Sequence, residues 1–123
     1  MEATFERAVG GYAILGRTTL RPKAGDAIET IEVIHADREA VAVRSWLFDS
    51  TGARAEGFFE SDGTTFNRRL AGTPAESASG RRAEWVQTIA PTGEGRFTMQ
   101  SIERTLDGRP LPDGTPLHFQ KIR

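Results

Sequence analysis

Two arginines in strand-like stretches are the residues best placed to do chemistry. Arg44 alternates with Trp46 and Phe48, so these three side chains share one face of an extended chain. Arg104 lies in a second stretch of the same kind. A guanidinium that faces an apolar interior needs a carboxylate partner or an anionic ligand. Either arginine could therefore anchor a ligand carboxylate, enolate or phenolate. The alternatives are a structural ion pair and stacking over Trp46 at the surface.

Aromatic and amide side chains extend this candidate site. Gln87 and Gln100 could donate hydrogen bonds in the same cavity. The aromatic residues serve either as pocket lining or as plain core, and about half of them are expected to be core. They are Tyr12, Trp46, Phe48, Phe58, Phe59, Phe66, Trp85 and Phe97. The predicted ligand-binding residues are Arg44, Trp46, Phe48, Trp85, Gln87, Gln100 and Arg104.

Other site chemistries have no supporting pattern in the chain. The sequence has no cysteine, and His35 and His118 are its two histidines, without the spacing of a metal site. We therefore predict neither a metal nor a cofactor. Ser45 and Ser101 lie in β stretches outside any G-x-S-x-G motif, which favours ordinary strand residues over nucleophiles.

Composition excludes several classes of partner. A net charge of −1 argues against nucleic acid and anionic membranes, which attract basic surfaces. The chain has no apolar run long enough to span a bilayer, and residues 1–7 lack the apolar core of a signal peptide. With no cysteine to oxidise, we expect a cytoplasmic protein. The length of 123 residues fits one domain, covering 1–123.

The elements that position these residues read as strands. The 13 glycines and six prolines are spread along the chain and mark frequent turns between β-branched and aromatic runs. The segment 27–35 could also be a helix, but it is short and β-branched, which favours a strand. The predicted strands are 4–9, 12–20, 27–35, 40–48, 54–60, 64–70, 82–90, 96–105 and 117–122.

The connections suggest how these strands are arranged. Most are short, which favours antiparallel neighbours in sequence order. The longer loop at 71–81 is a candidate flap or a simple connection, and 107–114 is a rigid connection. An all-β meander of about nine strands would curl and close to remove its edges. We expect an up-and-down β-barrel that encloses a small apolar ligand or is filled by its own side chains.

Several motifs, in order, resemble a family of lipocalin-like β-barrel proteins. This family consists mostly of uncharacterised bacterial proteins, found alone or behind SnoaL-like (nuclear-transport-factor-like) domains. The resemblance covers 44–113 well and the first forty residues weakly. The motifs are Arg44-Ser45-Trp46-x-Phe48-Asp49-Ser50-x-Gly52, Glu56-Gly57, Asp62-Gly63, Gly80-Arg81-Arg82-Ala83, Phe97-Thr98-x-Gln100-Ser101-x-x-Arg104 and Gly108-x-Pro110-Leu111-Pro112-Asp113.

The resemblance implies a calycin-type barrel and supplies no catalytic residues. The chain departs from the family at Phe59 and Met99, where tryptophan is frequent, and it lacks the family's first strand with its G-x-W motif. The missing strand would leave an edge that self-association could cover, so we expect a homodimer. The predicted function is binding of a small hydrophobic or aromatic ligand. The alternatives are a cofactor-independent isomerase or cyclase, by fold-level analogy, and an accessory dimer with a filled core.

Overall fold

All strands in the described part of the chain belong to one antiparallel sheet. The computed structural model describes residues 2–37, 42–61, 63–74 and 81–122. A short 3-10 turn, η1 (Val9–Gly11), joins the first two strands. The strands are β1 (Glu2–Ala8), β2 (Ala13–Leu20), β3 (Ile28–Asp37), β4 (Ala42–Asp49), β5 (Arg54–Ser61), β6 (Phe66–Thr73), β7 (Ala83–Gly93), β8 (Arg96–Leu106), β9 (Arg109–Pro110) and β10 (Leu117–Gln120).

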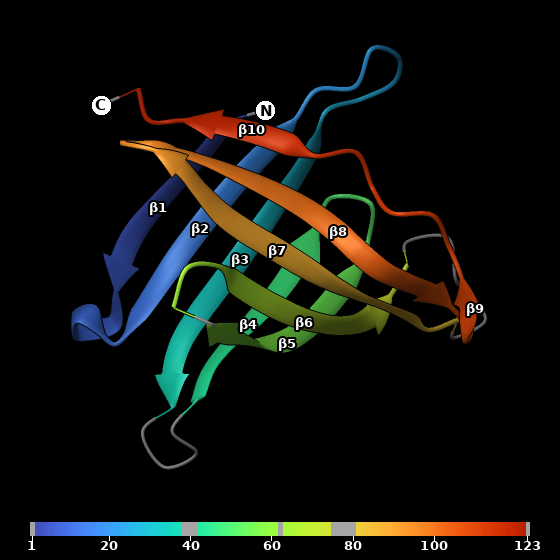
Figure 1. The fold of residues 1–123 in the computed structure, drawn as a ribbon, viewed down its shortest axis with the longest axis horizontal. Coiled ribbons are helices and arrows are strands. Elements are labelled where there is room, and N and C mark those ends of the chain that lie inside the picture. Colours follow the sequence, from blue (N-terminus) through green and yellow to red (C-terminus); the bar gives the residue numbers. More distant parts are fainter. Residues whose placement is uncertain (1, 38–41, 62, 75–80, 123) are drawn as a thin grey trace.

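The predicted up-and-down meander is confirmed. From β1 to β8 each strand pairs with the next one along the chain, and β10 then pairs with β8 (Figure 1). The two-residue β9 also pairs with β8, through Thr105 and Leu106. Short turns make this order the simplest way to satisfy the backbone hydrogen bonds of successive strands.

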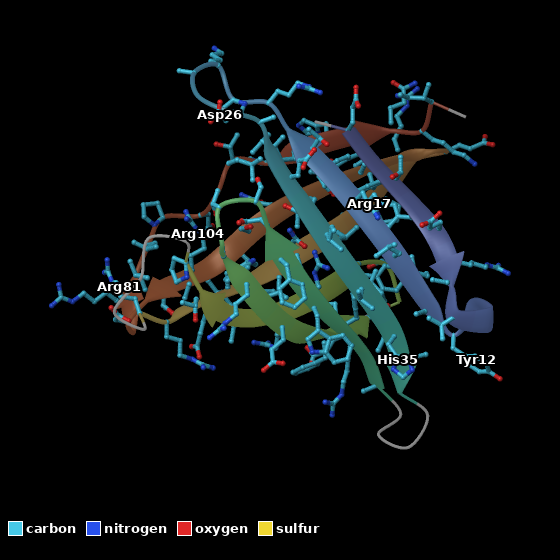
Figure 2. The ribbon with its side chains drawn as sticks, turned by 180° about the vertical axis from the view of Figure 1, so that it is seen from behind. Tyr12, Arg17, Asp26, His35, Arg81 and Arg104 are labelled. Carbon is cyan, nitrogen blue, oxygen red and sulfur yellow. The ribbon has the colours of Figure 1, made fainter. Side chains whose placement is uncertain are left out.

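The sheet curls over itself without closing. Figure 1 shows β7 and β8 passing in front of β1, β2 and β3, and Figure 2, seen from behind, shows β1 to β3 in front. Within the described residues β1 pairs with β2 alone, and β10 pairs with β8 alone. The expected closure of the barrel is therefore not seen, and the fold is an open, strongly curved sheet.

Several strand boundaries differ from those expected from the sequence. Ala71–Thr73 was expected to begin a loop but continues β6, and β7 runs past Pro91 to Gly93. The connection expected at 107–114 contains β9. These residues look like loop formers by composition, but pairing with a neighbouring strand satisfies their backbone groups. The rest of the expected loop, 75–80, and parts of the turns expected at 37–39 and 61–63 lie outside the described residues.

Burial identifies the inner face of the curved sheet. Along β4, Ser45 is 1% exposed, while Arg44 and Phe48 on the opposite face are exposed. The strand registers carry this assignment across the sheet, because residues opposite each other point to the same side. On β6 the inner face includes Arg68 and Leu70, each 4% exposed.

Two glycines permit the tight curl between β5 and β6. A Cβ atom at Gly57 would lie 1.7 Å from the carbonyl oxygen of Arg69, and one at Gly72 would lie 2.0 Å from that of Arg54. Any larger residue would push the two backbones apart. The small residues of β5 and β6 therefore bend the sheet toward its inner face.

Candidate functional site

A cleft of about 730 Å³ opens on the inner face at one end of the sheet. Strands from both halves of the chain contribute, since β2 and β3 lie across from β7 and β8 in the curled sheet. Its polar lining includes Thr30, Asp49, Ser101 and Arg104. Its apolar lining includes Leu20, Leu47, Ala55, Trp85, Leu106 and Leu111.

A β-bulge determines where Arg104 lies. The register between β7 and β8 shifts between Glu84 and Val86, so that Glu103 and Arg104 together stand opposite Trp85. Glu103 adopts a left-handed backbone conformation with φ of 49°. Bulges of this kind redirect side chains. Here Glu103 points to the outer face, whereas Arg104 lines the inner cleft. The Arg104 side chain is half-buried there.

The Arg104 guanidinium is held by a neutral group. Its Nη1 donates a hydrogen bond of 2.9 Å to the carbonyl oxygen of Pro112. The connection after β9 is itself fixed to β8, because the Leu111 amide donates to the Arg104 carbonyl at 2.8 Å. Figure 2 shows Arg104 at one end of the sheet and His35 at the opposite end.

A buried polar cluster centred on Arg68 occupies the middle of the inner face. Arg68 on β6 forms an ion pair with Glu32 on β3, and its Nε donates to the Gln87 side chain on β7 at 3.0 Å. The guanidinium carbon also lies 5.2 Å from the centre of the Phe59 ring. Burial lowers the pKa of Arg68, and the adjacent Glu32 carboxylate partly opposes this shift.

The cluster lies beside the cleft on the inner face, one same-face position further along β3 and β7. Gln87 follows Trp85 by two residues on the same face of β7, and it stands opposite Ser101. Glu32 likewise follows Thr30 by two residues on β3. Because Trp85, Ser101 and Thr30 line the cleft, the paired side chains of Arg68, Glu32 and Gln87 occupy the adjoining layer of the inner face.

The carboxylate of Asp49 is engaged by the turn that follows β4. Its Oδ1 accepts hydrogen bonds from the backbone amides of Thr51 at 2.9 Å and Ala53 at 3.1 Å. The hydroxyl of Thr51 donates to the same oxygen. Asp side chains in turns commonly accept hydrogen bonds from nearby backbone amides in this way. Asp49 therefore stabilises the turn at the edge of the cleft.

A second hollow, of about 680 Å³, lies on the outer face. Arg44 and Trp46 line it, together with Phe58 and Arg69. Arg44 and Trp46 therefore point away from the inner face. Ser45 points inward instead, opposite Gly57, where the tightly curved sheet leaves room for a small side chain.

The predicted site residues are thus divided between the two faces. Trp85 and Arg104 come together in the inner cleft, and Phe48 lies at its edge, 53% exposed. Gln87 is bound to Arg68 in the layer below. Gln100 stands opposite Thr88, away from Gln87, and its Nε2 donates to the Gly114 carbonyl at 3.0 Å. Ligand contact by any of these residues stays a prediction.

Sequence reasoning did not single out Arg68. The signal was nevertheless present, because alternation along β6 places Arg68 on one face with Phe66 and Leu70. Arg68 and Arg69 are adjacent in the sequence, and the structure places them on opposite faces of β6. Arg69 is 54% exposed, whereas Arg68 is 4% exposed.

The described residues contain neither a metal-binding cluster nor a membrane-spanning helix. No group of three or more His, Asp or Glu side chains there could hold a metal ion. His118 instead shares a hydrogen bond of 3.1 Å between its Nδ1 and the Thr98 hydroxyl. In the same part of the chain, no helix has the length and apolar character needed to cross a membrane.

Comparison with protein-family models, curated proteins and solved structures found no match to this chain.

Proposed function

We propose that the protein binds a small apolar or aromatic molecule in the inner cleft. The observation that carries this proposal is the cleft itself, whose volume of about 730 Å³ falls within the range of small-molecule sites. Its walls include Leu20, Leu47, Leu106 and the indole of Trp85. Burying a ligand against such side chains releases water from both surfaces, which favours binding.

The engagement of the nearby acids favours binding over a reaction. A general base needs a carboxylate that can reach the substrate proton. The Asp49 carboxylate accepts bonds from its own turn, and the Glu32 carboxylate is paired with Arg68. The inner face therefore offers apolar surface and hydrogen-bond donors more readily than a base.

The proposal includes the resemblance to lipocalin-like proteins and the expected homodimer. The up-and-down meander supports the resemblance, because lipocalin-like barrels share that strand order. Among the described residues, the outer edges of β1 and β10 pair with no further strand. This supports self-association, since an exposed strand edge invites pairing with another chain. A cytoplasmic location, expected from the cysteine-free sequence, belongs to the same proposal.

Titration with N-phenyl-1-naphthylamine, a neutral fluorescent aromatic probe, tests the binding function. We expect saturable binding at one site per chain, because the probe is apolar and smaller than the cleft. Native mass spectrometry of the freshly purified protein would report any natural ligand that stays bound.

A pair of matched variants assigns the probe to the cleft. Leu20 lines the cleft and is 37% exposed, whereas Ile31 stands opposite Phe48 on the outer face and is 39% exposed. We expect Leu20→Glu to weaken probe binding about tenfold or more, since a charge replaces apolar wall, and Ile31→Glu to leave it unchanged. Absence of probe binding, or equal weakening by both variants, would contradict the proposal.

A further inference from the structure

We infer that the ligand of the inner cleft carries a carboxylate, which Arg104 binds. This inference rests on the proposed binding function and adds the chemical class of the ligand to it. Arg104 projects into the cleft from the β8 bulge, beside the indole of Trp85. An apolar acid would place its hydrocarbon part against the apolar walls and its carboxylate on the guanidinium.

The other charged residues of the cleft are engaged or face outward. The Asp49 carboxylate accepts hydrogen bonds from the amides of its own turn. Arg54 stands opposite Phe48 on the outer face and is exposed. Glu84 is 55% exposed and pairs with Arg82, with Oε1 and Nε 2.9 Å apart. Among the described residues that line the cleft, Arg104 is therefore the cation on the inner face, and Arg54 lies at the rim.

Arg104 retains unused hydrogen-bonding capacity. A guanidinium carries five N–H donors in a planar fork. Among the described residues, the polar contact of its side chain is the bond from Nη1 to the neutral Pro112 carbonyl. That bond orients the guanidinium without neutralising its charge. A carboxylate can pair with such a fork through two parallel hydrogen bonds, a geometry that neutral ligands do not match.

Arg68 cannot take this role. It is 4% exposed, its charge is paired with Glu32, and its Nε and Nη2 donate to Gln87. An incoming carboxylate would have to displace these partners from the interior, leaving Glu32 unpaired there. Of the two arginines on the inner face that reach the cleft or its adjoining layer, Arg104 is the one whose charge a ligand can meet.

Two probes of matched shape test the inference. Binding of 2-naphthylacetic acid and of 2-(2-naphthyl)ethanol is measured by isothermal titration calorimetry at low salt. We expect the wild-type protein to bind the carboxylate about tenfold more tightly than the alcohol, a difference of ~1.4 kcal/mol. Arg104→Gln should remove this difference by weakening carboxylate binding while leaving alcohol binding unchanged.

Two further variants complete the design. Arg54→Gln removes a cation at the rim of the same cleft and should preserve the preference for the carboxylate. Arg104→Lys retains the positive charge without the planar guanidinium and should give an intermediate preference for the carboxylate probe. The same variant replaces Arg104→Gln in the test if circular dichroism shows that Arg104→Gln does not fold.

The outcomes separate this inference from the proposed function. If the wild type binds both probes equally, the carboxylate anchor is wrong and the binding function stands. If the preference survives in folded Arg104→Gln, another group binds the carboxylate and Arg104 is not the anchor. If neither probe binds, both the inference and the proposed function fail.

Discussion

Arg68 shows how one residue can connect distant parts of an open sheet. It lies on β6, yet its ion pair reaches Glu32 on β3, and these two strands are not neighbours in the sheet. Its bond to Gln87 then continues across to β7. Because no backbone pairing joins β1 to β10 in the described part of the chain, cross-sheet contacts of this kind help to hold the curl of the sheet.

We predict that Arg68→Met destabilises the protein by about 3–5 kcal/mol, since it leaves Glu32 without its partner at 13% exposure. The double variant Arg68→Met with Glu32→Leu should recover most of that loss, because both charges are then removed. Urea denaturation followed by circular dichroism measures the free energies of unfolding.

The neighbouring Arg69 provides the control for this prediction. Arg69 is 54% exposed, and its Nε lies 3.4 Å from the Glu60 carboxylate. An exposed pair contributes at most about 1 kcal/mol, so Arg69→Met should change stability little. Equal losses from Arg68→Met and Arg69→Met would show that the buried pair has no special role in the curl.

The site was less predictable from the sequence than the fold because face assignment depends on burial. Alternation correctly placed Arg44, Trp46 and Phe48 on one side of β4. It could not say that this side is the outer one, since both faces carry large apolar residues. The inward position of Arg104 depends on a bulge, and a local pattern does not reveal where a strand gains an extra residue.

At the scale of the elements, the turn residues and β-branched runs were enough to find the strands. The predicted strand boundaries were wrong where residues typical of loops pair with a neighbouring strand, as at Gly72 on β6 and Pro91 on β7. Barrel closure is not confirmed among the described residues. The strand count predicts a curled sheet, but closure requires the edge strands to meet in register, which no local pattern specifies.

The curl between β5 and β6 leads to a prediction about Gly57. We expect Gly57→Ala to destabilise the fold by about 3 kcal/mol or more, because the new Cβ would lie 1.7 Å from the Arg69 carbonyl oxygen. Backbone atoms cannot move aside as a flexible side chain does, so the two strands must separate. Thermal denaturation measures the loss.

Gly93→Ala is the matched control for the Gly57 prediction. Gly93 also lies in a strand, but the nearest atom to an added Cβ is 3.9 Å away, in the side chain of Arg96. Its substitution should be neutral or stabilising by up to about 1 kcal/mol, because alanine restricts the unfolded chain. If Gly57→Ala melts at the same temperature as Gly93→Ala, the close approach of β5 and β6 does not require glycine.

For the whole molecule, the open sheet leads to a prediction about assembly. β1 and β10 each offer a row of backbone groups that no described strand pairs. Pairing of β1 with β1 of a second copy would satisfy such groups on both chains by one two-fold contact. We predict a homodimer of twice 13.5 kDa, measured by size-exclusion chromatography with light scattering.

Proline substitution at the β1 edge tests this mode of assembly. Successive N–H groups of a strand point to opposite neighbours, so Ala3→Pro and Thr4→Pro remove donors from opposite sides of β1. One variant loses a donor on the free edge and should become a monomer with an unchanged circular dichroism spectrum. The other loses a donor toward β2 and should be destabilised. A wild-type monomer at all concentrations would refute the dimer, and dimers in both variants would place the contact away from β1.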